Sequence, residues 1–259
     1  MIIFFAALAG LATGSFLCLA ADRYYPGLNE RQWLVRLLAP PSRCHHCQRR
    51  IKLYDLIPFY SWVRLRGRCR YCDCRIPCRL LIVEVVTCTL FSLLAMSAPS
   101  PHALIFALLF TALLILLSLI DWRHLLLPDA LTLPLLWLGL LYHLLFSQEK
   151  LPAAVIGAIS GWLALWLLYW FFLLITRREG LGYGDLKLYA ALGAWCGWQM
   201  LPLIAIGAAL GGLLLFLHNR RWKGGAGVLH QQPFGPCLSL GGWITFFGLW
   251  QEEGAIFLL

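Results

Sequence analysis

Two carboxylates stand out in a chain that has few acidic residues. Asp121 follows the apolar run 102–120, and Asp185 ends the string that starts at Gly180, just before another apolar run. Two carboxyl groups held together in a poorly solvated site do not both ionise easily, so they share a proton and titrate as a pair. The ionised partner takes a proton from water attacking a peptide carbonyl, while the protonated partner donates to the carbonyl oxygen. The pair therefore predicts aspartic protease chemistry.

The glycines before Asp185 favour the same chemistry. Because glycine lacks a Cβ atom, Gly182 and Gly184 would let an extended substrate backbone come close. The competing interpretation is that both aspartates are helix-end residues at a membrane interface, with Asp185 as an N-cap and Asp121 solvated. The pattern alone leaves both interpretations open.

Asp185 has two possible partners, because Asp129 lies only eight positions after Asp121. Asp129 follows Pro128 and precedes an apolar run, where its carboxylate would serve as an N-cap and stay ionised. Asp121 instead ends an apolar helix, near the negative pole of the helix and partly desolvated, which suits a carboxyl group that must hold a proton. We therefore expect Asp121 to be the partner.

Membrane helices are predicted to position these aspartates. Of the 259 residues, 61% are hydrophobic and 13% are charged, far outside the composition of a soluble domain. A bilayer core about 30 Å thick needs roughly 20 apolar residues per helix. We predict an all-α polytopic membrane protein with about eight transmembrane helices, at residues 1–21, 80–98, 102–120, 130–146, 153–176, 188–199, 202–217 and 236–250. Close helix packing is predicted at three GxxxG spacings: Gly10/Gly14, Gly157/Gly161 and Gly207/Gly211.

Basic residues predict the orientation of these helices. Of the 21 Lys and Arg residues, 13 lie in residues 22–79, and all but one of the others lie in later loops on the same side. The positive-inside rule therefore places the basic loops and both aspartates in the cytoplasm and both termini in the periplasm. This orientation and the attraction to anionic lipid explain the net charge of +9, so no nucleic acid partner is required.

The chain is expected to have three parts: a first transmembrane helix at 1–21, a cytoplasmic zinc-binding domain at 22–79 and a helix bundle with the protease site at 80–259. The first part lacks basic residues ahead of its apolar run, so we expect a retained helix and not a cleaved signal peptide. The second part would have a small core, so a metal cross-link would help to stabilise it.

Four cysteines of this domain have the spacing of a structural zinc site. They form two C-x2-C pairs with 21 residues between them: Cys44, Cys47, Cys69 and Cys72. Four thiolates close a tetrahedral site and leave no open position for water, so the zinc would be structural. A pair of disulfides is the alternative, although thiols usually persist in the cytoplasm. Cys74 or Cys78 could replace Cys72 as a ligand.

Glu84 lies within the apolar span 80–98, and an ionisable side chain at such a place is a candidate for function. The competing interpretation is an interfacial residue about one turn into the helix, paired with Arg79. Glu179 lies beside Arg177 and Arg178, which indicates a local ion pair.

Taken in order, these motifs resemble the type IV prepilin peptidases, bifunctional leader peptidases and N-methyltransferases that serve type IV pili and type II secretion. The resemblance covers most of the chain. It is carried by Gly14-Ser15-Phe16-Leu17, the two C-x2-C pairs, Ile57-Pro58, Leu65 to Cys72, Glu84, Ile120-Asp121, Leu127-Pro128-Asp129, Gly180 to Asp185, and Pro233-Phe234-Gly235-Pro236.

The resemblance implies that Asp121 and Asp185 are the catalytic pair of a GxGD-type aspartyl protease in the bacterial inner membrane. It also implies a prepilin or pseudopilin substrate, whose basic leader ends in Gly and is cut before a hydrophobic helix. The new N-terminus would be methylated from S-adenosylmethionine, with Glu84 as a possible methyl-transfer site. Departures from the family pattern, such as Leu56 and Leu81, lie in the N-terminal third. We therefore expect methylation to be more fragile than cleavage.

Two other functional classes fit the sequence less well. An ion- or proton-coupled transporter would carry its acidic residues near the bilayer midplane, whereas these aspartates fall at one interface. A non-catalytic, zinc-bearing assembly factor would not need Asp121 and Asp185 intact.

Overall fold

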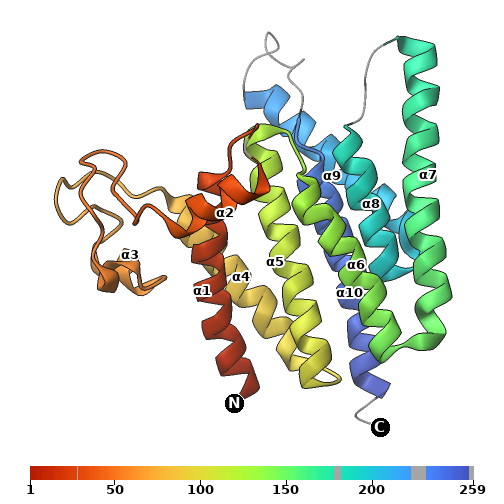
Figure 1. Ribbon diagram of the computed structural model, residues 1–259, viewed down its shortest axis with the longest axis horizontal. Helices are drawn as coiled ribbons and strands as arrows, with labels where there is room; N and C mark the ends of the chain where they lie inside the picture. The colour runs from red at the N-terminus through yellow and green to blue at the C-terminus, as the bar shows by residue number, and fades with distance from the viewer. Residues whose placement is uncertain (28, 178–181, 223–231, 257–259) are drawn as a thin grey trace. The chain divides into compact units, whose positions relative to one another are not determined.

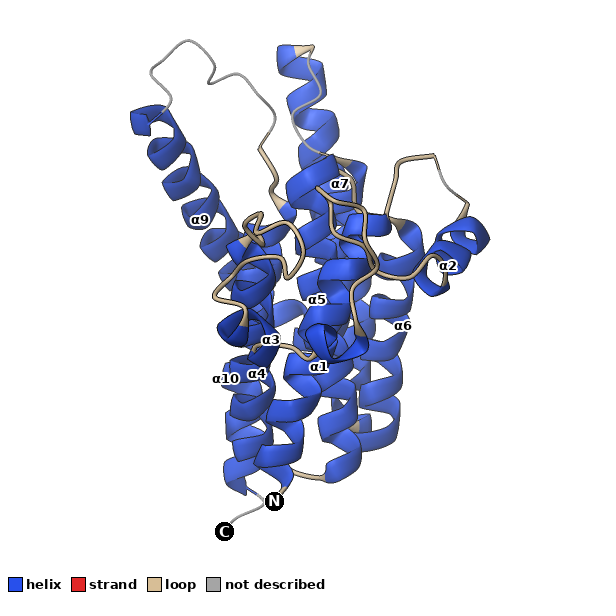
Figure 2. Cartoon of the chain, turned by 90° about the vertical axis from the view of Figure 1, so that its left-hand side faces the viewer, coloured by secondary structure: helices blue, strands red, loops and turns tan. Residues whose placement is uncertain are grey.

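The computed structural model describes all residues except 28, 178–181, 223–231 and 257–259. Helices form every regular element of the described residues (Figure 2), and two isolated β-bridges lie outside them. This confirms the predicted all-α class. The chain forms two compact units, Met1–Met96 and Ser97–Leu259.

The first unit contains two long helices and a cysteine-rich segment between them. Its helices are α1 (Ile2–Arg23), α2 (Glu30–Leu38), a 3₁₀ turn (Leu53–Leu56), α3 (Tyr60–Arg64) and α4 (Cys78–Met96). The backbones of α1 and α4 lie very close, since a methyl group at Gly10 would lie 2.7 Å from the Cα of Cys88. A methyl group at Gly14 would lie 2.8 Å from the Cα of Glu84. The first GxxxG spacing is therefore a helix contact, as predicted.

In the described residues, the second unit is a bundle of six α-helices. They are α5 (Pro101–His124), α6 (Asp129–Phe146), α7 (Leu151–Thr176), α8 (Tyr183–Cys196), α9 (Leu201–Trp222) and α10 (Gly235–Ile256). Successive helices run in opposite directions (Figure 1). The ends of α5, α7 and α9 therefore lie at the same end of the bundle as the starts of α6, α8 and α10. Asp121 and Asp185 both belong to this end.

Helices occur at all eight places where we predicted spans. Within the described residues, six stretches are long and apolar enough to cross a membrane: Ile2–Arg23, Cys78–Met96, Pro101–His124, Asp129–Phe146, Gln148–Thr176 and Trp198–His218. The other two predicted spans are α8, which has only 14 residues, and α10, which is not among the six and ends with the polar residues Gln251 and Glu252 in its last turns.

The core of the second unit surrounds Trp195 of α8. Its ring lies 4.6 Å from that of Phe110 in α5 and stacks at 5.5 Å on Tyr142 in α6, as measured between centroids. Its Nε1–H donates to the carbonyl of Leu135 at 2.8 Å. Every residue of α8 from Leu188 to Cys196 is buried. This buried stretch of α8 lies in the core, so the helix carries Asp185, near its start, into the interior.

The two remaining GxxxG spacings are also helix contacts. Gly157 of α7 meets the backbone of Gly193 in α8, at a separation that has no room for a methyl group. The position of a methyl group at Gly207 of α9 is 3.9 Å from the Cα of Gly241 in α10. The close packing predicted at Gly157 is confirmed, whereas Gly207 is exposed and makes only an ordinary contact with α10.

Candidate functional site

Asp121 lies in the last turn of α5 and is held by the start of α10. The helix ends at Leu125, a left-handed residue with φ of 53°, whose N–H donates to the Asp121 carbonyl at 2.9 Å. The Asp121 side chain is buried, and its Oδ2 accepts a hydrogen bond of 2.9 Å from the backbone N–H of Gly235. A helix start thus orients this carboxyl group from a segment 114 positions away.

Asp185 lies in the first turn of α8. Gly182 occupies the N-cap, so the alternative interpretation of Asp185 as the N-cap is wrong. The carboxyl group of Asp185 instead accepts the backbone N–H of Gly182, which satisfies one of the free donors at the helix start. This side chain is also buried, at 9% exposed.

The fold brings these two carboxyl groups together from distant parts of the chain. They interact electrostatically although 64 positions separate them. Asp121 lies at the negative end of α5 and Asp185 at the positive end of α8. Two buried carboxyl groups so arranged, each receiving one backbone N–H, are suited to share a proton.

Gly235 is the part of this site to which the sequence reasoning gave no role. A methyl group at Gly235 would lie 2.8 Å from Oδ2 and 3.1 Å from Cγ of Asp121, so only glycine leaves room for the carboxyl group. The signal in the sequence is a glycine directly before an apolar run, inside the string Pro233 to Pro236.

The two glycines expected to admit a substrate backbone differ in their surroundings. A methyl group at Gly184 would lie 2.8 Å from the Cβ of Leu127, so the missing side chain serves the packing of α8 against the α5–α6 turn. Around Gly182, among the described residues other than its chain neighbours, only Oδ2 of Asp185 lies within 4 Å of a methyl position. Of these two glycines, Gly182 is therefore the one whose methyl position meets a carboxyl oxygen and, among the described residues, no packed side chain. Gly180 lies outside the described residues.

Asp129 is engaged elsewhere. Its Oδ1 accepts a hydrogen bond of 2.6 Å from the Nζ of Lys187, and its side chain is 55% exposed. Pro128 is the N-cap of α6 and Asp129 its first residue, with no capping hydrogen bond from the side chain, so the predicted N-cap role of Asp129 is wrong. Its exposure and its ion pair separate it from the buried pair.

Glu84 does not pair with Arg79, the partner that one interpretation of the sequence gave it. Arg79 pairs with Asp22 at 3.0 Å, so the alternative that joined it to Glu84 is wrong. Glu84 is buried in α4, and its Oε2 accepts the backbone N–H of Phe59 at 2.8 Å. Phe59 has a φ of 60°, a conformation that costs a bulky residue free energy. Glu84 therefore fixes a strained turn of the cysteine-rich segment. Glu179 lies outside the described residues.

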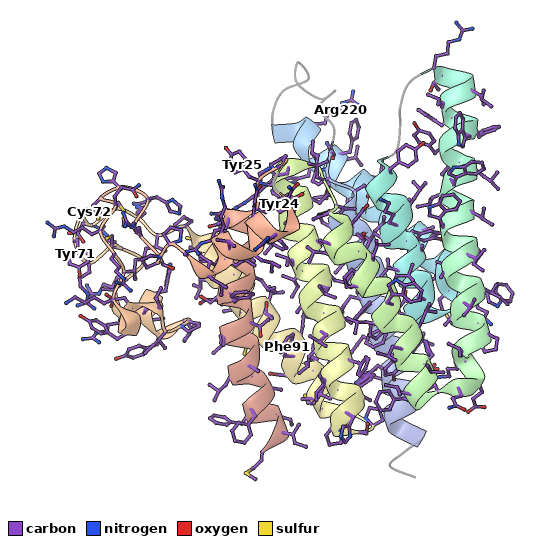
Figure 3. All side chains as sticks on the ribbon, viewed as in Figure 1. Tyr24, Tyr25, Tyr71, Cys72, Phe91 and Arg220 are labelled. Carbon is purple, nitrogen blue, oxygen red and sulfur yellow. The ribbon has the colours of Figure 1, made fainter. Side chains whose placement is uncertain are left out.

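The four cysteines predicted to bind zinc do converge. The sulfur atoms of Cys44, Cys47, Cys69 and Cys72 all lie within 4.8 Å of one another. Each pair sits in the same kind of turn. Gln48 and Asp73, the residues that follow the pairs, both have positive φ and donate their N–H to the carbonyl of the first cysteine of the pair. Figure 3 shows Cys72 on the loops of the first unit, away from Phe91 in α4. Such a cluster fits tetrahedral zinc.

One thiol of the cluster, that of Cys44, is favoured as a thiolate, and Cys74 lies beside the cluster. The backbone N–H of Cys47 donates to the Cys44 sulfur and lowers the pKa of that thiol to about 6. The sulfur of Cys74 is 3.5 Å from that of Cys44, against 3.8 Å for Cys72. The sulfur of either Cys72 or Cys74 could therefore serve as the fourth ligand.

An apolar groove of about 1240 Å³ lies between α9 and α10. Gly207, Gly211 and Gly241 form part of its lining, and Arg220 stands at the end of α9 (Figure 3). Neither Asp121 nor Asp185 lines it. The carboxyl pair is thus a site distinct from this groove.

Comparison with known proteins gives consistent matches along the chain. The model of the type IV leader peptidase family matches residues 108–217, and that of the bacterial peptidase A24 N-terminal domain matches residues 8–98. A prepilin leader peptidase/N-methyltransferase of Dichelobacter nodosus is 43% identical over 265 residues, covering 94% of this chain and 91% of the relative. One of the same description from Aeromonas hydrophila is 42% identical, covering 95% and 90%. No solved structure matches the chain.

Proposed function

This chain belongs to the type IV leader peptidase family, and we propose that it is a membrane aspartyl endopeptidase that removes the leaders of type IV prepilins or type II secretion pseudopilins. The observation that carries the proposal is the buried pair Asp121 and Asp185, which two helices bring together at one end of the bundle. A transporter would need its acidic groups along a path through the bundle, whereas these lie in terminal turns.

The pair performs the cleavage by sharing one proton. The ionised carboxylate takes a proton from water as the water oxygen attacks the scissile carbonyl, while the protonated partner donates to the carbonyl oxygen. A proton then passes to the leaving amine and the peptide bond breaks. The N–H groups of Gly235 and Gly182 keep the two carboxyl groups oriented before substrate arrives, which lowers the cost of reaching the reactive geometry.

The position of the pair suits a substrate that is half in the membrane. A basic leader lies in the cytoplasm and the apolar helix of a prepilin lies in the bilayer, so the bond between them falls at the interface, which helix-end residues occupy. We place this site, the basic loops and the zinc domain of residues 22–79 on the cytoplasmic side of the bacterial inner membrane, with both termini in the periplasm. The substrate is cut after a glycine. Because neither that glycine nor Gly182 has a side chain, the extended substrate backbone can lie close to Gly182.

The cysteine cluster of residues 22–79 binds one structural zinc ion in this proposal. Zinc would hold the two turns together in a region that is too small for a large core. Cys72 supplies the fourth ligand. If zinc is retained in Cys72→Ser and lost only when Cys74→Ser is added, Cys74 is the ligand instead.

Methylation of the new N-terminus is the second proposed activity, because the relatives are described as leader peptidase/N-methyltransferases. S-adenosylmethionine would supply the methyl group. Glu84 is 6% exposed and bound to Phe59, so it does not fit a direct cofactor contact. We assign it a supporting role, in which it positions the turn at Phe59.

Side-by-side cleavage assays of Asp→Asn variants test the proteolytic function. Asp121→Asn and Asp185→Asn each remove a titratable group with little change of size, and we expect both to abolish leader removal. Asp129→Asn is the matched control and should retain cleavage, because its carboxylate pairs with Lys187. The product is identified by its mass and N-terminal sequence. Cleavage by Asp185→Asn within a few-fold of the unmodified chain would refute the carboxyl pair.

A further inference from the structure

One buried hydroxyl group differs from the others in the helices. The buried Ser and Thr side chains are Thr87, Thr111, Thr132, Thr245 and Ser239. Each of the four threonines donates to the carbonyl four residues earlier. Ser239 is 4% exposed, and its Oγ has no hydrogen-bond partner among the described residues. A buried hydroxyl without a partner is costly, so one that persists calls for a ligand.

Ser239 lies on the face of α10 that looks between the two helices carrying the aspartates. Gly235, one turn earlier on this face, binds Asp121. Gly242, one turn later, packs against Leu192 of α8. Phe246 lies on the same face, and its ring centroid is 4.6 Å from that of Phe110 in α5. Ser239 therefore stands one turn deeper in the bundle than the carboxyl pair, between α5 and α8.

Helix geometry directs its side chain back toward that pair. The Cα–Cβ bonds of a helix tilt toward its N-terminus, so the side chain of Ser239 leans over the turn that contains Gly235. Gly235 has no side chain, and the space beside it is taken by the carboxyl group of Asp121. The tilt therefore directs the hydroxyl group toward the end of α10 that binds Asp121, and it forms no hydrogen bond with either carboxyl group.

We propose that Ser239 positions the catalytic water, by donating a hydrogen bond to the water that Asp121 and Asp185 activate. This inference rests on the proposed protease function. An ordered buried water needs two to four polar partners, and the hydroxyl group with the two carboxyl groups provides three. The water then directs its hydrogens to the carboxyl groups and one lone pair to Ser239. Its other lone pair is left for attack on the scissile carbonyl.

The experiment compares steady-state prepilin cleavage by the full-length chain and three variants. We expect Ser239→Ala to lower kcat about tenfold with KM unchanged, the effect of losing one hydrogen bond in the transition state. Ser239→Thr keeps the hydroxyl group and should restore kcat to within about threefold. The control is Thr245→Val on the same helix, whose hydroxyl bonds to Gly241, and it should leave kcat unchanged.

The pH dependence separates this role from a direct bond to a carboxyl group. If Ser239 acts on water, the apparent pKa values of the acidic and basic limbs of the pH profile of kcat/KM stay the same in Ser239→Ala. A shifted limb, an unchanged kcat, or an equal loss in Thr245→Val would each overturn the inference. Asp185→Asn is assayed alongside. If it is inactive while Ser239→Ala is normal, the inference alone fails, whereas if it remains active, the proposed function fails and the inference with it.

Discussion

Gly235→Ala tests how the position of Asp121 is fixed. The added methyl group would lie 2.8 Å from Oδ2 of Asp121, closer than real contacts permit, so the carboxyl group or the start of α10 must move. Either movement weakens the 2.9 Å hydrogen bond from the Gly235 N–H. A hydrogen bond to a charged group contributes about 1.5–3 kcal/mol. If that stabilisation acts in the transition state, we expect kcat to fall roughly tenfold to a hundredfold.

Gly248→Ala is the matched control, because Gly248 lies on the same helix and no described residue has an atom within 4 Å of a methyl position there. Alanine is the better helix former, so this variant should fold at least as well and cleave normally. Initial rates of prepilin cleavage are measured at equal amounts of folded protein, with thermal unfolding followed by circular dichroism. Equal rates for the two variants would refute the reasoning, because Asp121 would then not depend on its contact with Gly235.

Three further predictions concern the other groups of the chain. Metal analysis of the purified protein should find about one zinc per chain, and Cys44→Ser combined with Cys69→Ser should remove it, whereas thiols that resist alkylation until reduced would indicate disulfides. Lys187→Gln should leave cleavage within about twofold and change stability by less than about 1 kcal/mol, because its ion pair with Asp129 is largely exposed; a large loss of activity would tie Lys187 to the carboxyl pair. Glu84→Ala should reduce methylation at least tenfold with cleavage near normal, as read from the mass of the mature product, and unchanged methylation would contradict its supporting role.

Features that depend on residues close together in the sequence could be predicted from the sequence alone. The apolar stretches located the helices because a polar backbone in lipid must satisfy its own hydrogen bonds. The cysteine spacing predicted convergence because two turns of the same kind present paired thiols. Asp121 and Asp185 stood out because a carboxyl group near apolar helices is costly. Their placement at the same membrane interface followed from the number of predicted spans. One of those spans, α8, is a short helix of 14 residues.

The tertiary structure alone decided which groups meet across helices. Glu84 binds Phe59, not Arg79, and Gly235 holds Asp121 from a segment 114 positions away. Such partners depend on the rotation and the depth of each helix in the bundle. A stretch that is apolar on every side, as the stretch 188–196 of α8 is, carries no sequence pattern that fixes its rotation. The sequence therefore did not predict which side of α10 Ser239 occupies. The contacts of Gly235 with Asp121 and of Gly242 with Leu192 define that side in the structure.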